Sequence, residues 1–267
     1  MHPLAPARPR QATPERPVGV DRVLLVLKEL GRHPQAVSLD ELARKVGLPK
    51  SSAHRALTAL RRAGFAEQDG PGRYRLGLEL VRLAFEYYEH YDERALVLPA
   101  LQALVERFAE TAHFARLDGG EIVYVAKVEP PKRHALMSSR IGGRNPAHCT
   151  GLGKAMLAHV LADDDAVEAF VDEHGPLVRR TRRTLATAAE LAPELERIRC
   201  RCYALDDEES EEGIVCIAFP LFLASPKLPS GAISVAALAH RTPRAALEAA
   251  AGEIVSLIER HLGPVTR

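Results

Sequence analysis

The spacing of apolar residues predicts three short helices near the start of the chain. Apolar side chains recur at helical intervals over residues 18–30. A second helix is expected to begin at Ser38, because Ser38 and Glu41 form a capping box, and to end at Gly47. The third helix follows Pro49 and buries one apolar stripe. Two helices joined by a glycine turn are typical of a helix-turn-helix, whose second helix presents its first residues to DNA bases.

A short hairpin is predicted directly after these helices. Arg73 and Arg75 would share one face of its second strand, while Tyr74 and Leu76 would pack on the helices. Two outward arginines suit contacts with phosphates, so residues 18–77 are expected to form a winged helix-turn-helix. Lys50 would also bind phosphate. The other residues expected to face DNA are Ser51, Ser52, His54, Arg55 and Thr58.

Beyond residue 78 the pattern mixes helices with strands. A helix over residues 78–91 carries a broad apolar stripe, which either a partner chain or the chain's own second domain would bury. A further helix is expected to reach Phe108. Later helices are predicted from Ala155, within residues 161–200, and over Pro243–His261. Strands are predicted around Asp118-Gly119-Gly120 and over His134–Ser139, Ile214–Leu223 and Gly231–Leu238. This mixture favours an α+β domain.

The charge is unevenly distributed along the chain. Of 36 Lys/Arg and 35 Asp/Glu, residues 1–80 hold 14 and 8, which leaves 22 and 27 for the remainder. A basic front indicates that the first domain meets a polyanion. Residues 1–17 lack the apolar segment of a secretion signal and are expected to be a disordered tail. Since no apolar run approaches the roughly 20 residues that span a bilayer, we expect a cytoplasmic protein with no membrane partner.

The cysteines indicate neither a disulfide framework nor a metal site. Cys200 and Cys202 are too close together for the usual zinc spacing, so neither a metal nor a cofactor is expected. His148 and Cys149 could form a thiol nucleophile with its base, which would make the chain a Cys-dependent hydrolase with an accessory helix-turn-helix domain. Adjacent residues rarely turn their side chains towards one another, however, and a buried thiol is the favoured interpretation.

A glycine-rich loop, Thr150-Gly151-Leu152-Gly153-Lys154, precedes the helix predicted at Ala155. It lacks the first glycine and the final Ser or Thr of a nucleotide-binding loop. A glycine turn that runs into a helix N-terminus can still hold an anion, although a purely structural turn explains the glycines equally well. The acidic run Asp206–Glu209 is expected to be a solvated loop, and the arginines of residues 179–183 an exposed charged face.

Several segments, in this order, resemble the isocitrate-lyase-regulator (IclR) family of bacterial transcription factors over about residues 18–262. They are SLDELARKVGLPKSSAHRAL, RYRLGLEL, RNPAHCTGLGKAMLAH, and YALDDEESEEGIVCIAFP followed by GAISVAA. The resemblance implies a winged-helix domain, a linker helix used in dimer contacts, and a GAF-like domain that senses small metabolites, often carboxylates or aromatic acids. The effector-binding positions that it implies are the backbone of Gly151 and Leu152, the side chains of Asp206, Cys216 and Ser234, and Ala236, where some relatives carry a hydroxyl.

These observations predict a transcriptional regulator, a repressor or an activator and not an enzyme. It would bind a double-stranded operator as a homodimer or a dimer of dimers, under the control of a small organic acid. The expected division is a tail at 1–17, a winged helix-turn-helix at 18–77, a linker helix at 78–92 and a GAF-like α/β effector domain at 93–267.

Overall fold

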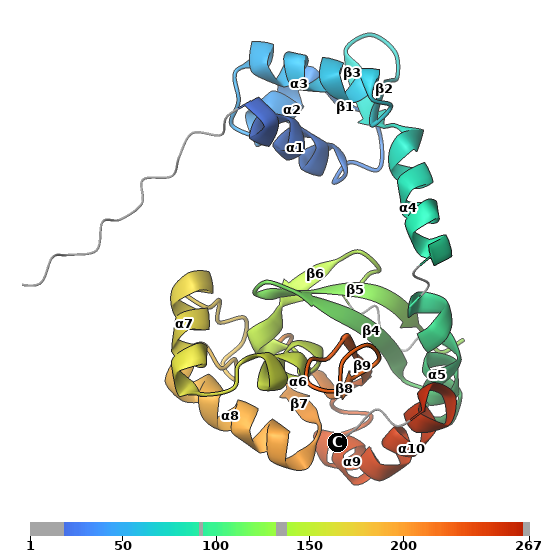
Figure 1. The fold of residues 1–267 in the computed structure, drawn as a ribbon, viewed down its shortest axis with the longest axis vertical. Coiled ribbons are helices and arrows are strands. Elements are labelled where there is room, and N and C mark those ends of the chain that lie inside the picture. The colour runs from blue at the N-terminus through green and yellow to red at the C-terminus, as the bar shows by residue number, and fades with distance from the viewer. Residues whose placement is uncertain (1–18, 91–92, 132–137, 264–267) are drawn as a thin grey trace, which may run out of the picture. The chain divides into compact units, whose positions relative to one another are not determined.

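The computed structural model of this chain describes residues 19–90, 93–131 and 138–263, and it divides into two compact units after Asp92 (Figure 1). Two expectations from the sequence fall outside these residues: the tail, and most of the strand at His134–Ser139. Ser138 and Ser139, at the end of that segment, are described and are not in a strand. Among the helices described, none has the length and apolarity that crossing a bilayer requires.

The first unit is a three-helix domain with a small sheet, followed by one more helix. Its elements are α1 (Gly19–Leu30), β1 (Val37–Ser38), α2 (Leu39–Lys45), α3 (Lys50–Arg62), β2 (Ala66–Gln68), β3 (Arg73–Leu76) and α4 (Leu78–His90). The expected cap is present, since Ser38 Oγ accepts a hydrogen bond from the Glu41 N–H at 3.2 Å. Strand β1, which the apolar pattern did not predict, pairs with β3 and gives the sheet the order β1-β3-β2.

The wing has the two faces that its alternation predicted. Arg73 and Arg75 are exposed, whereas Tyr74 is 4% exposed and packs in the core of the unit. Leu57 and Leu60 of α3 belong to the same core. The hairpin is therefore fastened to the helices by its apolar face, and its arginines are left outside.

The second unit is an α/β domain built on a six-stranded antiparallel sheet. Its strands are β4 (Thr111–Asp118), β5 (Glu121–Val128), β6 (Arg144–Pro146), β7 (Ala204–Asp207), β8 (Ile214–Leu221) and β9 (Gly231–Leu238), in the order β6-β5-β4-β9-β8-β7. Its helices are α5 (Glu93–Phe108), the 3-10 turn Ala147–Cys149, α6 (Gly151–Val160), α7 (Asp164–His174), α8 (Ala188–Arg201), α9 (Arg244–Ala249) and α10 (Ala251–Leu262). This arrangement is consistent with the GAF-like domain expected.

Helices cover both faces of the sheet (Figure 1). One core joins the sheet to α6, α7 and α8, and the other joins it to α5, α9 and α10. Alternation along the strands divides their residues between the two cores: Cys216 and Ala218 face α6, while Ile217 and Phe219 belong to the opposite core. Inward positions of β7, β8 and β9 thus meet the first turn of α6.

Four predicted elements have different bounds. Helix α6 begins at Gly151 instead of Ala155, because Thr150 caps it and accepts from the Gly153 N–H at 3.0 Å. Residues 175–187 interrupt the helical stretch predicted between 161 and 200. The last helix is two helices that meet at Ala250, and β8 ends at Leu221.

Candidate functional site

The outer surface of α3 agrees with the polar residues predicted there, with one exception. Ser51, His54 and Arg55 are exposed, and Lys50 Nζ lies 2.6 Å from Asp40 Oδ1. Thr58 is half-buried, and its hydroxyl donates to the His54 carbonyl at 2.9 Å. The placement of Ser52 on the outer surface was wrong: its residue is only 8% exposed, because it lies one helical turn before the buried Ala56.

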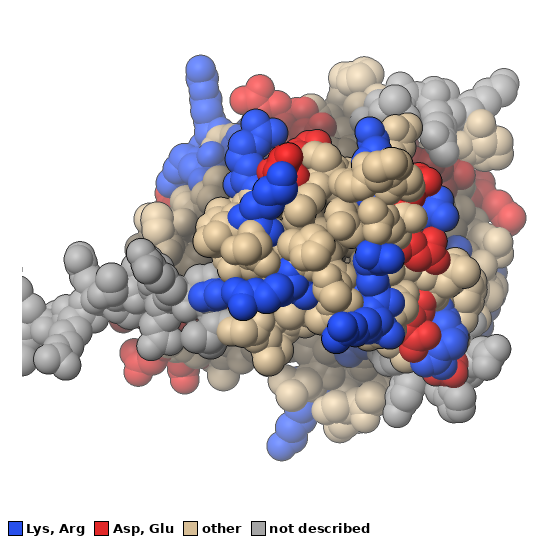
Figure 2. Space-filling model, turned by 90° about the horizontal axis from the view of Figure 1, so that it is seen from above, with Lys and Arg blue, Asp and Glu red and all other residues tan. Residues whose placement is uncertain are grey.

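Both arginines of the wing already have partners within the unit. Arg75 contacts Glu67 Oε2 at 3.1 Å, and Arg73 donates to the Ala36 carbonyl. Seen from above the first unit, Lys and Arg side chains are spread across the face among uncharged residues, with most Asp and Glu side chains towards its margins (Figure 2). A phosphate that binds Arg75 must therefore compete with Glu67. This competition is easily won, because the exposed Arg75–Glu67 ion pair is weak in water.

The second unit contains a cavity of about 50 Å³ between the sheet and the start of α6. All six effector positions implied by the family resemblance line it: Gly151, Leu152, Asp206, Cys216, Ser234 and Ala236. Sequence reasoning missed the remaining lining residues, which are His113, Tyr124, Ser138, Ser139, Asn145, Thr150, Ser210, Glu211 and Ile214. Most of these residues carry polar side chains, and the cavity lies on the side of the sheet that faces α6, where Tyr124, Leu152, Cys216 and Ala236 belong to the core.

The first turn of α6 supplies hydrogen-bond donors to this cavity. The N–H of Gly153 bonds to the Thr150 hydroxyl, and that of Lys154 bonds to the Thr150 carbonyl at 2.9 Å. Gly151 and Leu152 are the first two residues of α6, where the helix offers their N–H groups no carbonyl, and no hydrogen bond from either N–H is found among the described residues. A methyl group on Gly151 would lie 2.9 Å from the Cys216 sulfur, so glycine lets this turn approach β8. The result is a pair of free donors at the positive end of a helix, which suits an anion.

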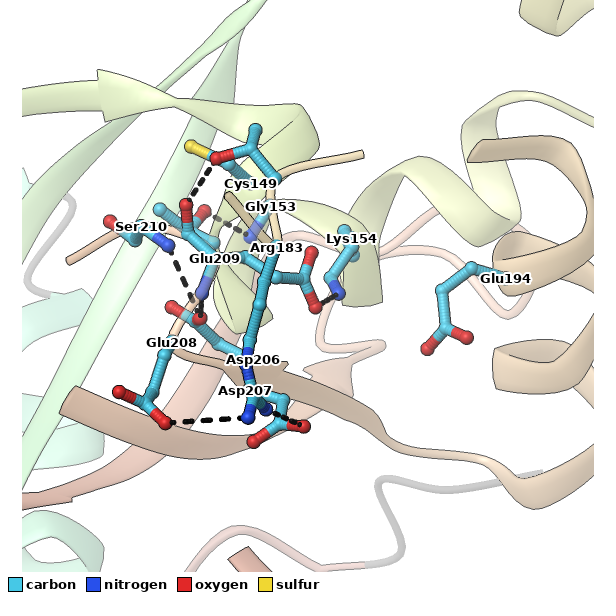
Figure 3. Close-up of polar contacts among 12 residues, drawn as sticks. Cys149, Gly153, Lys154, Arg183, Glu194, Asp206, Asp207, Glu208, Glu209 and Ser210 are labelled. Atoms are coloured by element: carbon cyan, nitrogen blue, oxygen red, sulfur yellow. Dashed lines mark hydrogen bonds and ion pairs between the residues drawn. The ribbon is translucent and has the colours of Figure 1, made fainter. Parts of the chain in front are cut away.

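Asp206 faces the same cavity and is 4% exposed. Its Oδ1 accepts hydrogen bonds from the backbone N–H groups of Glu209 at 2.8 Å and Ser210 at 3.3 Å (Figure 3). Burial raises the pKa of Asp206 to about 7, and the nearby Lys154 ammonium opposes that rise. The expectation of a solvated acidic loop was wrong for Asp206 and Glu209, which are both buried.

A buried ion pair explains how the acidic loop is held. Lys154 Nζ contacts Glu209 Oε1, and the side chain of Lys154 is fully buried (Figure 3). The segment predicted as an exposed charged face holds the loop from the other side: Thr184 donates to the Glu209 carbonyl at 2.7 Å, and Arg183 contacts Asp207 Oδ2 at 2.6 Å. The arginines of that segment are exposed as expected, but Arg183 pairs with the acidic run.

The cysteines in this region are not arranged as nucleophiles. Burial raises the pKa of Cys149 to about 12, and it raises the pKa of Cys216 as well. The His148 ring hydrogen-bonds the Val178 carbonyl at 3.1 Å, so its Nε2 is engaged away from the thiol. Neither thiol has the lowered pKa that an attacking thiolate requires. Among the described residues, no group of three or more His, Cys, Asp or Glu could hold a metal ion.

The missed lining residues lie on strands and loops where polar side chains occupy inward positions. His113 on β4 contacts Ser139 Oγ at 2.9 Å, and burial lowers the pKa of His113 to about 3. Tyr124 on β5 accepts a hydrogen bond from Asn145 Nδ2 at 3.1 Å. The signal available in the sequence was a His or Tyr at an inward position of an otherwise apolar strand.

Comparisons with known proteins agree on one family. The model described as "Bacterial transcriptional regulator IclR C-terminal" matches residues 85–258, and that of the IclR helix-turn-helix domain matches residues 19–70. The transcriptional regulator XynR of Escherichia coli is 32% identical over 229 residues, which are 85% of this chain and 89% of the relative. The relatives are transcriptional regulators, and the hydrolase alternative finds no support among them.

Two solved structures have the same fold. The Thermotoga maritima IclR aligns with a TM-score of 0.66 at 28% identity, over 91% of this chain and 98% of that one. An IclR homologue from Microbacterium hydrocarbonoxydans, complexed with 4-hydroxybenzoate, aligns with a TM-score of 0.71 at 24% identity, over 90% of this chain and 98% of that one. The second likeness concerns the fold alone.

Proposed function

The chain belongs to the IclR family of bacterial transcriptional regulators, and from that premise we propose that it binds an operator as a homodimer or a dimer of dimers and that a small organic acid controls this binding. The observation that carries the second half of the proposal is the pair of free N–H groups at Gly151 and Leu152 beside a buried Asp206. The division at 18–77, 78–92 and 93–267 is proposed with it, as is a place in the cytoplasm, where operators lie.

For DNA, we assign the approach to base edges to Ser51, His54 and Arg55, which are exposed on the N-terminal half of α3. Lys50 and the wing arginines Arg73 and Arg75 would contact phosphates. Among the described residues, the partners of these three are Asp40, the Ala36 carbonyl and Glu67, which water or a phosphate can replace. Thr58 is a weaker candidate because its hydroxyl is engaged, and Ser52 would act only through the packing of α3.

For the effector, we assign the carboxylate to the N–H groups of Gly151 and Leu152. A carboxylate there would accept two charge-assisted hydrogen bonds in addition to the attraction of the helix dipole. Cys216 and Ser234 would contact the rest of the ligand, and Ser234 Oγ is buried without a partner among the described residues. Ala236 offers only a methyl group, so contacts there would be apolar.

For self-association, the support lies in the apolar side chains of α4. Leu78, Val81 and Phe85 are 73%, 47% and 64% exposed in the single chain. Burying an apolar side chain stabilises an association by roughly 1.5–3 kcal/mol, so a helix with several such exposed residues favours a partner. The simplest partner is a second copy of the chain, because a symmetric dimer presents two α3 helices to two half-sites.

The direct test is footprinting on the DNA upstream of the protein's own gene, with and without a panel of carboxylic acids. Each acid is matched by its neutral amide, which keeps the shape and removes the charge. We expect protection of a two-fold-symmetric site and a change in occupancy with an acid but not with its amide. Absence of any protected site would contradict operator binding. In a thermal-shift measurement with the same panel, stabilisation of the protein by the amides but not by the acids would contradict the assignment of the carboxylate.

A further inference from the structure

Tyr124 presents a hydrogen-bond donor to the cavity in a direction that its neighbours determine. Its side chain lines the cavity, and the residue is 7% exposed. Within the described residues its hydroxyl has one hydrogen bond, which it accepts from Asn145 Nδ2 at 3.1 Å. Because a phenol has a single proton, that proton remains available for another acceptor.

The direction of this hydrogen bond is set by an arginine outside the cavity. Arg180 Nη1 donates to Asn145 Oδ1 at 2.8 Å. A guanidinium can only donate, so the amide oxygen of Asn145 must face Arg180 and its NH₂ group must face Tyr124. The NH₂ group can only donate as well, which obliges the tyrosine oxygen to accept and turns its own proton away from Asn145.

The backbone of β5 places Tyr124 towards the cavity. Opposite β4, Phe114 pairs with Ala126 and Ala115 pairs with Tyr124, so Val125 is an extra residue in β5. Such a bulge changes the side on which the following residues lie and is a common means of aiming a side chain at a binding site. Burial raises the pKa of Tyr124 to about 12, so the hydroxyl keeps its proton at every physiological pH.

We propose that Tyr124, positioned by Asn145 and Arg180, is a specificity-determining residue that donates a hydrogen bond to an oxygen of the effector other than its carboxylate. The preferred ligands are then acids with a second oxygen, in a hydroxyl or oxo group. This inference rests on the proposed binding of an organic acid in the cavity. It adds a second recognition point, on residues 21 or more positions apart in the sequence.

The test compares ligands that differ by one oxygen, by calorimetry on the full chain. The pairs are lactate against propionate, and 4-hydroxybenzoate against benzoate. A neutral hydrogen bond contributes about threefold to about tenfold in affinity, so the wild type is expected to prefer one or both oxygenated acids by that factor. In Tyr124→Phe the ratio of the two affinities is expected to fall to about one, with the affinity for the acid lacking the second oxygen nearly unchanged.

A second substitution separates orientation from mere packing. Asn145→Asp keeps a partner for Arg180 but makes the side chain an acceptor, so the tyrosine proton should turn towards it and leave the cavity. Both acids of a pair should then bind more weakly because of the added negative charge, and their ratio should fall as in Tyr124→Phe. Arg180→Met removes the donor that fixes the Asn145 amide, so the amide can turn either way. The affinity ratio of each pair should then fall between the wild-type value and one. Arg182→Met is the matched control, because Arg182 is exposed and has no partner among the described residues; its ratio should equal that of the wild type.

Two outcomes would overturn the inference while leaving the proposed function in place. One is a wild type that binds both acids of each pair with equal affinity. The other is a Tyr124→Phe or Asn145→Asp variant that keeps the wild-type ratio. If the wild type binds none of the acids, the proposed organic-acid effector fails together with this inference.

Discussion

Replacing Lys154 with Met is expected to destabilise the second unit strongly, because it leaves a buried carboxylate without its counter-ion. Lys154 is fully buried, and its ammonium is the described partner of Glu209 Oε1. The other oxygen, Oε2, is buried and has no partner among the described residues. Breaking a buried pair by removing one ion typically costs about 3–5 kcal/mol. Methionine fills a similar volume, so the loss arises from the charge and not from a cavity.

The loss depends on pH in a direction that identifies its cause. Burial raises the pKa of Glu209, and removing the ammonium raises it further. The folded variant then holds a proton that the unfolded chain releases above its ordinary pKa of 4.5. Since the folded state binds more protons in this window, its stability falls as the pH rises through it. The deficit of Lys154→Met should be smaller at about pH 5 than at about pH 8.

The assay is thermal unfolding of the full chain, followed through the transition of the second unit. A loss of about 3–5 kcal/mol corresponds to a lowering of the Tm by about 6–20 °C for a domain of this size. Arg183→Met is the control, since it breaks an exposed pair with Asp207 that contributes about 1 kcal/mol or less.

The double variant Lys154→Met/Glu209→Gln should recover most of the Tm, because it removes both charges. The reasoning is refuted if Lys154→Met unfolds within about 2 °C of the wild type, or if its deficit is the same at both pH values.

Four further predictions concern DNA and the effector. Arg73→Ala should weaken binding to every DNA sequence and lower the slope of log affinity against log salt by about one unit; an unchanged slope in an anisotropy titration would remove the wing from the phosphate contacts. Arg55→Ala should relax the preference at one base pair by about 1–3 kcal/mol, and an equal loss on operator and random DNA would show that it contacts only the backbone. Because burial raises the pKa of Asp206 to about 7, calorimetry should find that propionate binds up to about tenfold more weakly for each pH unit above that value, as the aspartate ionises and repels it; an affinity independent of pH would contradict this. Gly151→Ala should weaken acid binding by roughly tenfold or more, since the new methyl group lies 2.9 Å from the Cys216 sulfur and must displace the turn that supplies the donors; an unchanged Kd would show that the turn tolerates the shift.

The helices of the first unit could be predicted because local signals mark their ends. Ser38 caps α2, and Gly47 adopts a positive φ of 66° after it. Ser52 was misplaced because it was judged by its polarity. Its position decides its burial: Ser52, Ala56 and Leu60 are four residues apart and form one stripe of α3 that faces the core. A small hydroxyl at such a position is buried with the stripe.

The acidic loop could not be predicted from its own residues, since its burial depends on contacts with distant segments. Glu209 pairs with Lys154, which is 55 residues earlier, and its carbonyl accepts from Thr184, which is 25 residues earlier. Which residues of β5 face the cavity could not be predicted from the sequence for a related reason. A bulge at Val125 is visible only once β5 is paired with β4, and without it Tyr124 and Lys127 could not both face the cavity side.

In the proposed binding mode, recognition of the effector depends on the same two elements that stabilise the domain. Helix α6 supplies both the free N–H groups of Gly151 and Leu152 and the buried ammonium of Lys154. The loop after β7 supplies both Asp206 and Glu209, and the Glu209 N–H orients the Asp206 carboxylate. A ligand held between these elements therefore strengthens a link that the ion pair already makes. Such a ligand shifts a conformational equilibrium only by the difference between its affinities for the two states. In the proposed binding mode, any state in which α6 and this loop moved apart would lose the ion pair and the ligand contacts together, and this shared dependence would give the acid a different affinity for the two states.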